Sequence, residues 1–198
     1  MPGTMLACIP SMNAITETLA PSATDLLRAD HTKVLGAFHR YKIASTPDKK
    51  RAVVNTVCLS LEVHAQVEEE LFYPALRGAD PAVVEKSVPE HDEMRSLIAT
   101  LRGLEPTSEA YDRTFMELMR TVIHHVADEE TTLFADAERL LGAELGTLGT
   151  QIMKRKLQLM MPRAGEMAKN SARSMPAMPM MLAAGALVAG ALLLRRRA

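Results

Sequence analysis

Residues 64–72 read HAQVEEELF, and residues 125–134 repeat this pattern as HVADEETTLF. In both stretches a histidine precedes a glutamate by four residues, and the two histidines lie 61 residues apart. Residues four apart lie on one face of an α-helix, about one turn from each other. Each stretch therefore predicts a helix that presents an imidazole and a carboxylate side by side.

A second repeat precedes the first in each half of the chain. Asp30-His31 returns as Glu90-His91, 60 residues later. The near-equal offsets predict two helical hairpins, each with one histidine on its first helix and a HxxxE pair on its second. Two such hairpins packed together would bring six side chains to one place. The six residues are His31, His64, Glu68, His91, His125 and Glu129.

Proline and glycine residues divide the middle of the chain into long helical segments. Pro89, inside the third segment, predicts a kink or a late start for that helix. No stretch shows sustained strand alternation, and short connections between long helices favour antiparallel neighbours. The sequence therefore predicts an all-α fold, an antiparallel up-down-up-down four-helix bundle with an additional C-terminal helix. The helices are expected at about 24–44, 48–77, 81–102, 108–141 and 144–161.

Helical periodicity places the repeated polar residues on the inner faces of these helices. His64, Glu68 and Leu71 continue the apolar stripe of the second helix. On the fourth helix His125 continues the apolar stripe, whereas His124 falls on a polar face. Carboxylates and imidazoles left unpaired in an apolar interior would cost several kcal/mol per ion in rough terms. A metal pair compensates for them most simply, with a metal-free polar core as the alternative.

Four strings carry a family resemblance within residues 24–141: LLRADHTKVL, HAQVEEELFYPAL, EHDEMRSLIATL and HHVADEETTLF. In this order they resemble the hemerythrin-like HHE cation-binding domain. The resemblance implies metal contacts from the six residues named above, with Glu68 and Glu129 as bridges in a non-haem centre of two iron ions. Imidazole with carboxylate suits iron, and zinc or manganese are the other metals considered.

One departure from the family pattern affects the expected function. Oxygen-carrying hemerythrins have a further histidine one turn after position 91, where this chain has Arg95. Arginine cannot bind the metal, so a coordination position is left for a small molecule. We therefore expect a protein that binds or senses oxygen, nitric oxide or iron itself. The alternative is a di-iron redox enzyme that consumes peroxide or another small oxidant.

The charge distribution and the end of the chain suggest the remaining organisation. The net charge is −1, but residues 163–198 carry six Lys or Arg and one Glu, so the rest of the chain is mildly acidic. No basic face indicates nucleic-acid binding. The expected parts are a flexible N-terminal arm (1–22), the metal-binding bundle (23–142), an additional helix with a basic linker (143–174) and a hydrophobic tail (175–198).

The tail suggests a membrane anchor. Residues 175–194 carry no charge, and three arginines follow them. A helix over 179–194 would be about 24 Å long, somewhat short of the roughly 30 Å hydrocarbon core. Its small residues suit close helix packing, which would allow a homo-oligomer through the tails. We expect a cytoplasmic domain anchored by this tail, with an apolar helix packed on the bundle or on a second copy as the alternative.

Overall fold

The computed structural model describes residues 21–79, 84–85 and 87–174. Within these ranges every regular element is a helix, which confirms the all-α prediction. The hydrophobic tail (175–198) and all but the last two residues of the expected N-terminal arm (1–22) lie outside the described residues.

The first hairpin consists of α2 (Ala23–Phe38) and α3 (Pro47–Val67). A capping box at Ser22 begins α2, since its hydroxyl accepts a hydrogen bond from the backbone N–H of the third helical residue. The helix ends at Phe38, six residues before the predicted end. Tyr41 explains the early end: its ring packs on Phe115 with centroids 4.3 Å apart, and its hydroxyl donates to Asp112.

Both long second helices contain a π-helical turn at the predicted site. In the first hairpin, α3 continues through η1 (Glu68–Phe72) into α4 (Tyr73–Ala79). The second hairpin repeats this order: α5 (Ser87–Gly103), α6 (Glu109–Asp128), η3 (Glu129–Leu133) and α7 (Phe134–Leu141). A π-helical turn has i→i+5 hydrogen bonds and often occurs at functional sites. Each turn begins at the glutamate of a HxxxE pair.

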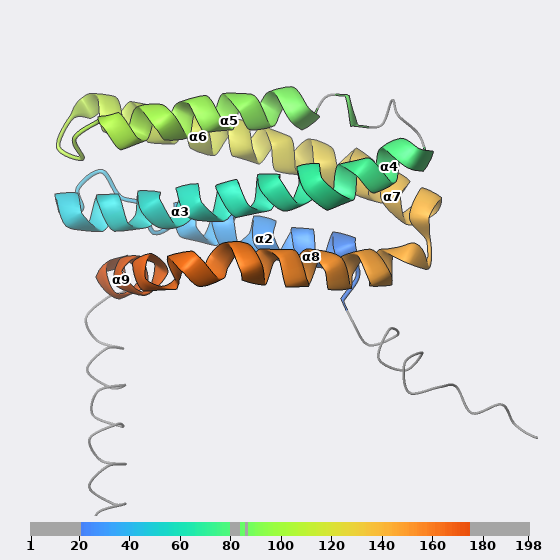
Figure 1. Ribbon diagram of the computed structural model, residues 1–198. Coiled ribbons are helices and arrows are strands. Elements are labelled where there is room, and N and C mark those ends of the chain that lie inside the picture. Colours follow the sequence, from blue (N-terminus) through green and yellow to red (C-terminus); the bar gives the residue numbers. More distant parts are fainter. Residues whose placement is uncertain (1–20, 80–83, 86, 175–198) are drawn as a thin grey trace, which may run out of the picture.

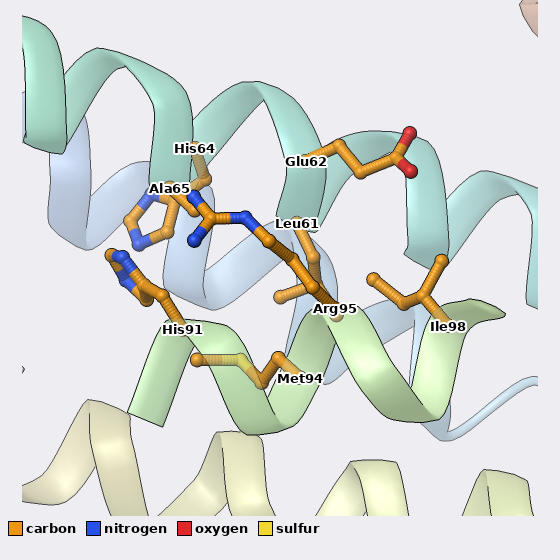
Figure 2. Close-up of a pocket in the computed structure, with 8 residues that line it drawn as sticks. All are labelled: Leu61, Glu62, His64, Ala65, His91, Met94, Arg95 and Ile98. Carbon is orange, nitrogen blue, oxygen red and sulfur yellow. The ribbon is translucent and has the colours of Figure 1, made fainter. Parts of the chain in front are cut away.

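The four long helical segments lie side by side, with the C-terminal helices against the first pair (Figure 1). α2 contacts α3, and α5 contacts α6. Leu61 on α3 faces Met94 and Ile98 on α5, and all three belong to one apolar core cluster (Figure 2). α5 begins later than predicted, at Ser87, so Pro89 falls in its first turn, where proline is tolerated.

The chain after the second hairpin forms α8 (Glu144–Met160), the short 3-10 turn η4 (Met161–Arg163) and α9 (Ala164–Ser174). α8 lies along α2 and α3, and Gly149 permits a close approach, because a Cβ there would lie 2.3 Å from the carbonyl oxygen of Pro21. α9 packs along α3. Residues 164–174 are therefore a packed helix, where the sequence suggested a basic linker.

Two apolar cores fill the described interior, and the predicted site lies between them. The first joins the end of α2 and the start of α3 to α5 and α6, around Val57 and Phe115. The second joins the start of α2 to α4, α7 and α8, around Leu27 and Phe72. Burial of one such side chain contributes roughly 1.5–3 kcal/mol. The polar cluster thus lies midway along the helices, with an apolar core packed on each side of it.

The expectation of a membrane-anchored protein is wrong on this structure. Within residues 21–79, 84–85 and 87–174, no helix has the length and apolar character needed to cross a membrane. The described helices have one apolar face and one charged face, as in α8, where Arg155 and Lys156 form ion pairs with Glu70 and Asp30. The segment on which the expectation rested, 175–194, lies outside the described residues.

Candidate metal centre

The six sequence-predicted side chains are all buried at one level of the molecule. None is more than 4% exposed. His31 comes from α2 and His91 from α5, the first helix of each hairpin. The HxxxE pairs come from the ends of α3 and α6 and from the first residues of the two π-helical turns. The structure therefore brings together all six residues.

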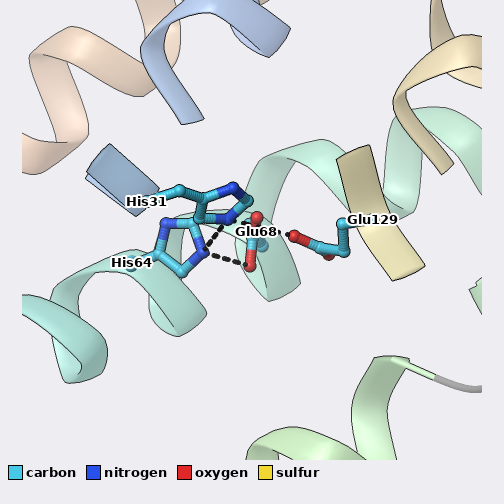
Figure 3. Close-up of side chains that lie close together, drawn as sticks. All are labelled: His31, His64, Glu68 and Glu129. Carbon is cyan, nitrogen blue, oxygen red and sulfur yellow. Dashed lines mark hydrogen bonds and ion pairs between the residues drawn. The ribbon is translucent and has the colours of Figure 1, made fainter. Parts of the chain in front are cut away.

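Each glutamate lies between two histidines from different helices. Glu68 Oε2 is 3.3 Å from Nε2 of both His64 and His91. Glu129 Oε2 is 3.4 Å from Nε2 of both His31 and His125. Figure 3 shows four of these side chains pointing toward one another from three segments of the chain. Nε2 is thus the inward nitrogen of every histidine in the cluster.

The possible ligand atoms form two overlapping groups, and within each group they lie within 4.8 Å of one another. The first group contains His31, His64, Glu68 and Glu129, and the second contains Glu68, His91 and His125. Glu68 belongs to both groups. An arrangement of this kind can hold two cations that share a carboxylate.

An outer layer of carboxylates faces the other nitrogen of each histidine. Donation of Nδ1–H to a carboxylate fixes the ring tautomer and leaves the Nε2 lone pair free for a metal. Three of the four contacts are hydrogen bonds of 2.8–2.9 Å, and the fourth is a longer contact of 3.7 Å. The pairs are His31 with Glu130, His91 with Glu69, His125 with Glu90, and, at the longer distance, His64 with Asp30.

Sequence reasoning missed this outer layer, although each of its residues directly adjoins a predicted one. The repeated acid before the histidine supplies Asp30 and Glu90, and the second acid of each glutamate doublet supplies Glu69 and Glu130. Asp30 and Glu90 each contact a histidine of their own hairpin. Glu69 and Glu130 each contact a histidine of the other hairpin. The outer layer therefore ties the two hairpins together.

Tyr73 is a further residue of the site that the sequence did not indicate. It is fully buried, and its hydroxyl donates to Glu129 Oε1 at 2.8 Å and lies 3.4 Å from both Glu68 Oε2 and His91 Nε2. Its ring stacks on His91, just as Phe134 stacks on His31 in the other half. One hydroxyl group therefore makes the two halves of the cluster chemically different.

The buried charges of the cluster shift its pKa values in opposite directions. Burial raises the pKa of Glu68 well above its usual range, and the charge of Glu129 adds to that rise. Burial would also raise the pKa of Glu129, but the close contact with His31 and the neighbouring imidazoles lower it to about 2. Burial and the charge of His125 lower the pKa of His91 to about 4. A bound cation would stabilise the ionised carboxylates and the neutral imidazoles together.

Several inward atoms of the cluster have no hydrogen-bond partner among the described residues. These atoms include Glu68 Oε1, His125 Nε2 and Glu129 Oε2. Buried polar atoms are nearly always paired in native proteins, and an unpaired one costs roughly 1–3 kcal/mol. All three are potential metal-ligating atoms. The residues present therefore fit a metal site.

Two nearby residues lie outside the cluster. The side chain of His124 is 72% exposed and forms ion pairs with Glu90 and Asp128, at 3.8 and 3.7 Å. The side chain of Arg95 is 43% exposed and forms an ion pair of 2.6 Å with Glu69. Because Glu69 also binds His91 Nδ1, Arg95 is linked to the cluster through that carboxylate.

Glu90→Gln is expected to weaken metal binding by roughly 10–100-fold, because it removes the carboxylate that contacts Nδ1 of His125 and orients its ring. Isothermal titration of the metal-free protein with a divalent cation measures this change. Glu93→Gln is the matched control, since Glu93 lies on the same helix but approaches Thr121 rather than a histidine. Equal affinities for the two variants would show that the outer carboxylate does not support the site.

A helical fold with a buried cluster of histidines and glutamates defines a class of metal-binding helical proteins. The family model described as "Hemerythrin HHE cation binding domain" matches residues 22–173. The chain belongs to the hemerythrin HHE cation-binding family, as its sequence motifs suggested.

Relatives and a solved structure are similar to parts of this chain. An uncharacterised protein of Mycobacterium tuberculosis is 28% identical over 142 residues, which is 70% of this chain and 87% of that protein. A DNA nickase of Nostoc sp. is 29% identical over 121 residues, which is 61% of this chain but only 34% of the nickase. A crystal structure of a hemerythrin HHE cation-binding domain protein from Mycobacterium kansasii is similar with a TM-score of 0.63 at 19% identity, covering 78% of this chain and 99% of that one.

Proposed function

We propose that the buried cluster holds two iron ions inside an antiparallel four-helix bundle, and that the protein binds or senses a small molecule at this pair. The observation that carries the proposal is the pair of overlapping ligand groups that share Glu68. A single metal would not need the second group. Bundle cores with inward glutamates and histidines are a known way to hold two metals.

The donor set favours iron over the other metals considered. Mixed imidazole and carboxylate ligands suit iron, whereas structural zinc sites are usually closed, with four ligands each. In the proposed centre His31 and His64 would hold one ion, His91 and His125 the other, and the two glutamates would lie between them. When bound, an iron pair supplies one-electron redox chemistry and affinity for small oxygen- or nitrogen-containing ligands.

The outer carboxylates and Tyr73 would shape this centre. The outer layer holds three of the four imidazoles, those of His31, His91 and His125, with Nε2 inward before a metal arrives, which reduces the reorganisation needed for binding. The Tyr73 hydroxyl lies near Glu68, His91 and Glu129, so it would make the second position different from the first. A small molecule would then meet two unequal ions.

The test uses the full chain loaded with iron and then reduced. Nitric oxide is added in the absence of air, and oxygen is added to a separate sample. Each gas is expected to produce a stoichiometric change in the absorption spectrum. A separate assay follows the disappearance of hydrogen peroxide. Binding spectra without sustained peroxide consumption would support a binding or sensing role. Consumption of many equivalents of peroxide per protein would instead establish the redox enzyme, and no spectral change with any ligand would overturn the proposal.

A further inference from the structure

Among the four histidines of the cluster, His64 differs in the surroundings of its outer nitrogen. Nδ1 of His31, His91 and His125 each lies 2.8–2.9 Å from a carboxylate oxygen. Nδ1 of His64 lies 3.7 Å from Asp30 Oδ2, too far for a hydrogen bond. It has no hydrogen-bond partner among the described residues, although His64 is only 4% exposed. A buried polar atom of this kind requires a physical explanation.

The carboxylate of Asp30 is held by Lys156 instead. Nζ of Lys156 donates to both carboxylate oxygens of Asp30, including the Oδ2 that faces His64. The two side chains are 12% and 14% exposed, so solvent and salt screen this ion pair little. A charged ammonium is also a stronger hydrogen-bond donor than a neutral imidazole N–H. Lys156 therefore competes with His64 for the same oxygen atom.

Lys156 reaches the site from outside the two hairpins. It lies on α8, which packs along α2 and α3 (Figure 1). In the other hairpin Glu90 is the counterpart of Asp30, and among the described residues its ion pairs are with His124 and His125 only. Its contact with Nδ1 of His125 is 2.8 Å long. The internal repeat thus contains the same contact without a competing ammonium group.

The inner contacts of His64 indicate which of its nitrogens carries the hydrogen. Nε2 of His64 and Nε2 of His31 are 3.1 Å apart, so one of them must donate (Figure 3). Because His31 Nδ1 donates to Glu130, a neutral His31 has its lone pair on Nε2 and accepts from His64. A neutral His64 then carries its hydrogen on Nε2. Metal binding through Nε2 must move this hydrogen to Nδ1, where Lys156 holds the acceptor Asp30 away.

We propose that Lys156 is a positioning residue of the metal centre: it holds Asp30 away from His64 and so makes the position of His31 and His64 the weaker of the two cation positions. The inference rests on the proposed function and identifies which position loads last and releases its ion first. Loss of an outer contact to a ligating histidine lowers metal affinity by roughly 10–100-fold. Through this ion pair, α8 controls the metal pair from outside the two hairpins.

The first test uses the metal-free full chain and needs no variant. Nitrogen NMR of isotopically labelled histidines, in mildly alkaline buffer, distinguishes a ring nitrogen that carries hydrogen from one that does not. His31, His91 and His125 are expected to carry their hydrogen on Nδ1, and His64 on Nε2. A His64 hydrogen on Nδ1, as in the other three, would overturn the proposal.

The second test titrates the metal-free full chain with Mn²⁺ and measures the heat of binding. Lys156→Met is expected to tighten the weaker of two binding steps by about tenfold or more, because Asp30 becomes free to accept from His64 Nδ1. The tighter step should not change. Lys156→Arg keeps a cation beside Asp30 and should behave like the wild-type chain. Lys154→Met, an exposed substitution on the same helix, is the matched control.

The fold of Lys156→Met is checked by circular dichroism. Lys156→Gln, whose side chain is neutral but can still contact Asp30, replaces it if the methionine variant is not helical. Two equal binding steps in the wild-type chain, or a weaker step that neither variant tightens, would overturn the proposal.

Two further outcomes have distinct meanings. Asp30 is one methylene shorter than Glu90. Tightening by Asp30→Glu but not by Lys156→Met would show that short reach, rather than the ion pair, keeps Asp30 from His64, and would overturn the role of Lys156. A chain that binds neither Mn²⁺ nor iron would overturn the proposed function, and the NMR spectrum would still decide which nitrogen of His64 carries the hydrogen.

Discussion

His125→Ala is expected to remove most of the bound metal, whereas His124→Ala is expected to leave the metal in place. His125 is 1% exposed and its Nε2 lies 3.4 Å from Glu129, inside the cluster. The side chain of His124 is 72% exposed, and surface substitutions of this kind usually change stability by less than about 0.5 kcal/mol. Metal analysis of both purified variants measures the difference.

The two variants control for each other, because they make the same change at adjacent positions of one helix. Circular dichroism should show a helical spectrum for both, so that metal loss in His125→Ala is not mistaken for unfolding. Should His124→Ala lose the metal and His125→Ala retain it, the inward face of α6 would be assigned wrongly.

Removal of the metal is expected to lower the melting temperature by roughly 10 °C. A ligand that binds only the folded state stabilises it by about 4 kcal/mol at a thousand times its dissociation constant, and 1 kcal/mol corresponds to about 2–4 °C for a chain of this size. The metal-free cluster also keeps its unpaired atoms, including Glu68 Oε1 and His125 Nε2. Thermal unfolding before and after chelation measures the shift.

The matched control is the same chelation applied to His125→Ala, which should respond little because it holds little metal. Restoring the metal to the wild-type chain should recover its melting temperature. A melting temperature that does not change after verified removal would mean that the cluster is stable as a metal-free polar core.

The sequence predicted the six inward residues because they repeat at matched offsets on apolar helix faces. It did not predict Tyr73, and the π-helical turns explain why. Regular spacing after Glu68 placed Leu71 on the inner face, yet Leu71 is only partly buried. In the π-helical turn the backbone N–H of Tyr73 donates to the carbonyl of Glu68, five residues earlier, so Tyr73 lies over the glutamate instead. Propensity alone does not reveal such a turn.

Other differences arise from contacts between segments far apart in the sequence. α2 was expected to continue beyond Phe38, but Tyr41 leaves the helix to pack against Phe115 on α6. The sequence did not predict the layer of outer carboxylates, because Glu69 and Glu130 contact histidines of the opposite hairpin. Helical periodicity describes one helix at a time, so it cannot say which neighbour an exposed acid will meet.

The central claim is that this chain holds a pair of iron ions, and elemental analysis tests it most directly. The full chain is purified without chelator, and iron, zinc and manganese are measured against protein concentration. We predict close to two irons per chain, as a duplicated ligand set requires, with a near-ultraviolet charge-transfer absorption after oxidation. One zinc per chain, or no metal in a chain with an intact helical fold, would contradict the di-iron account.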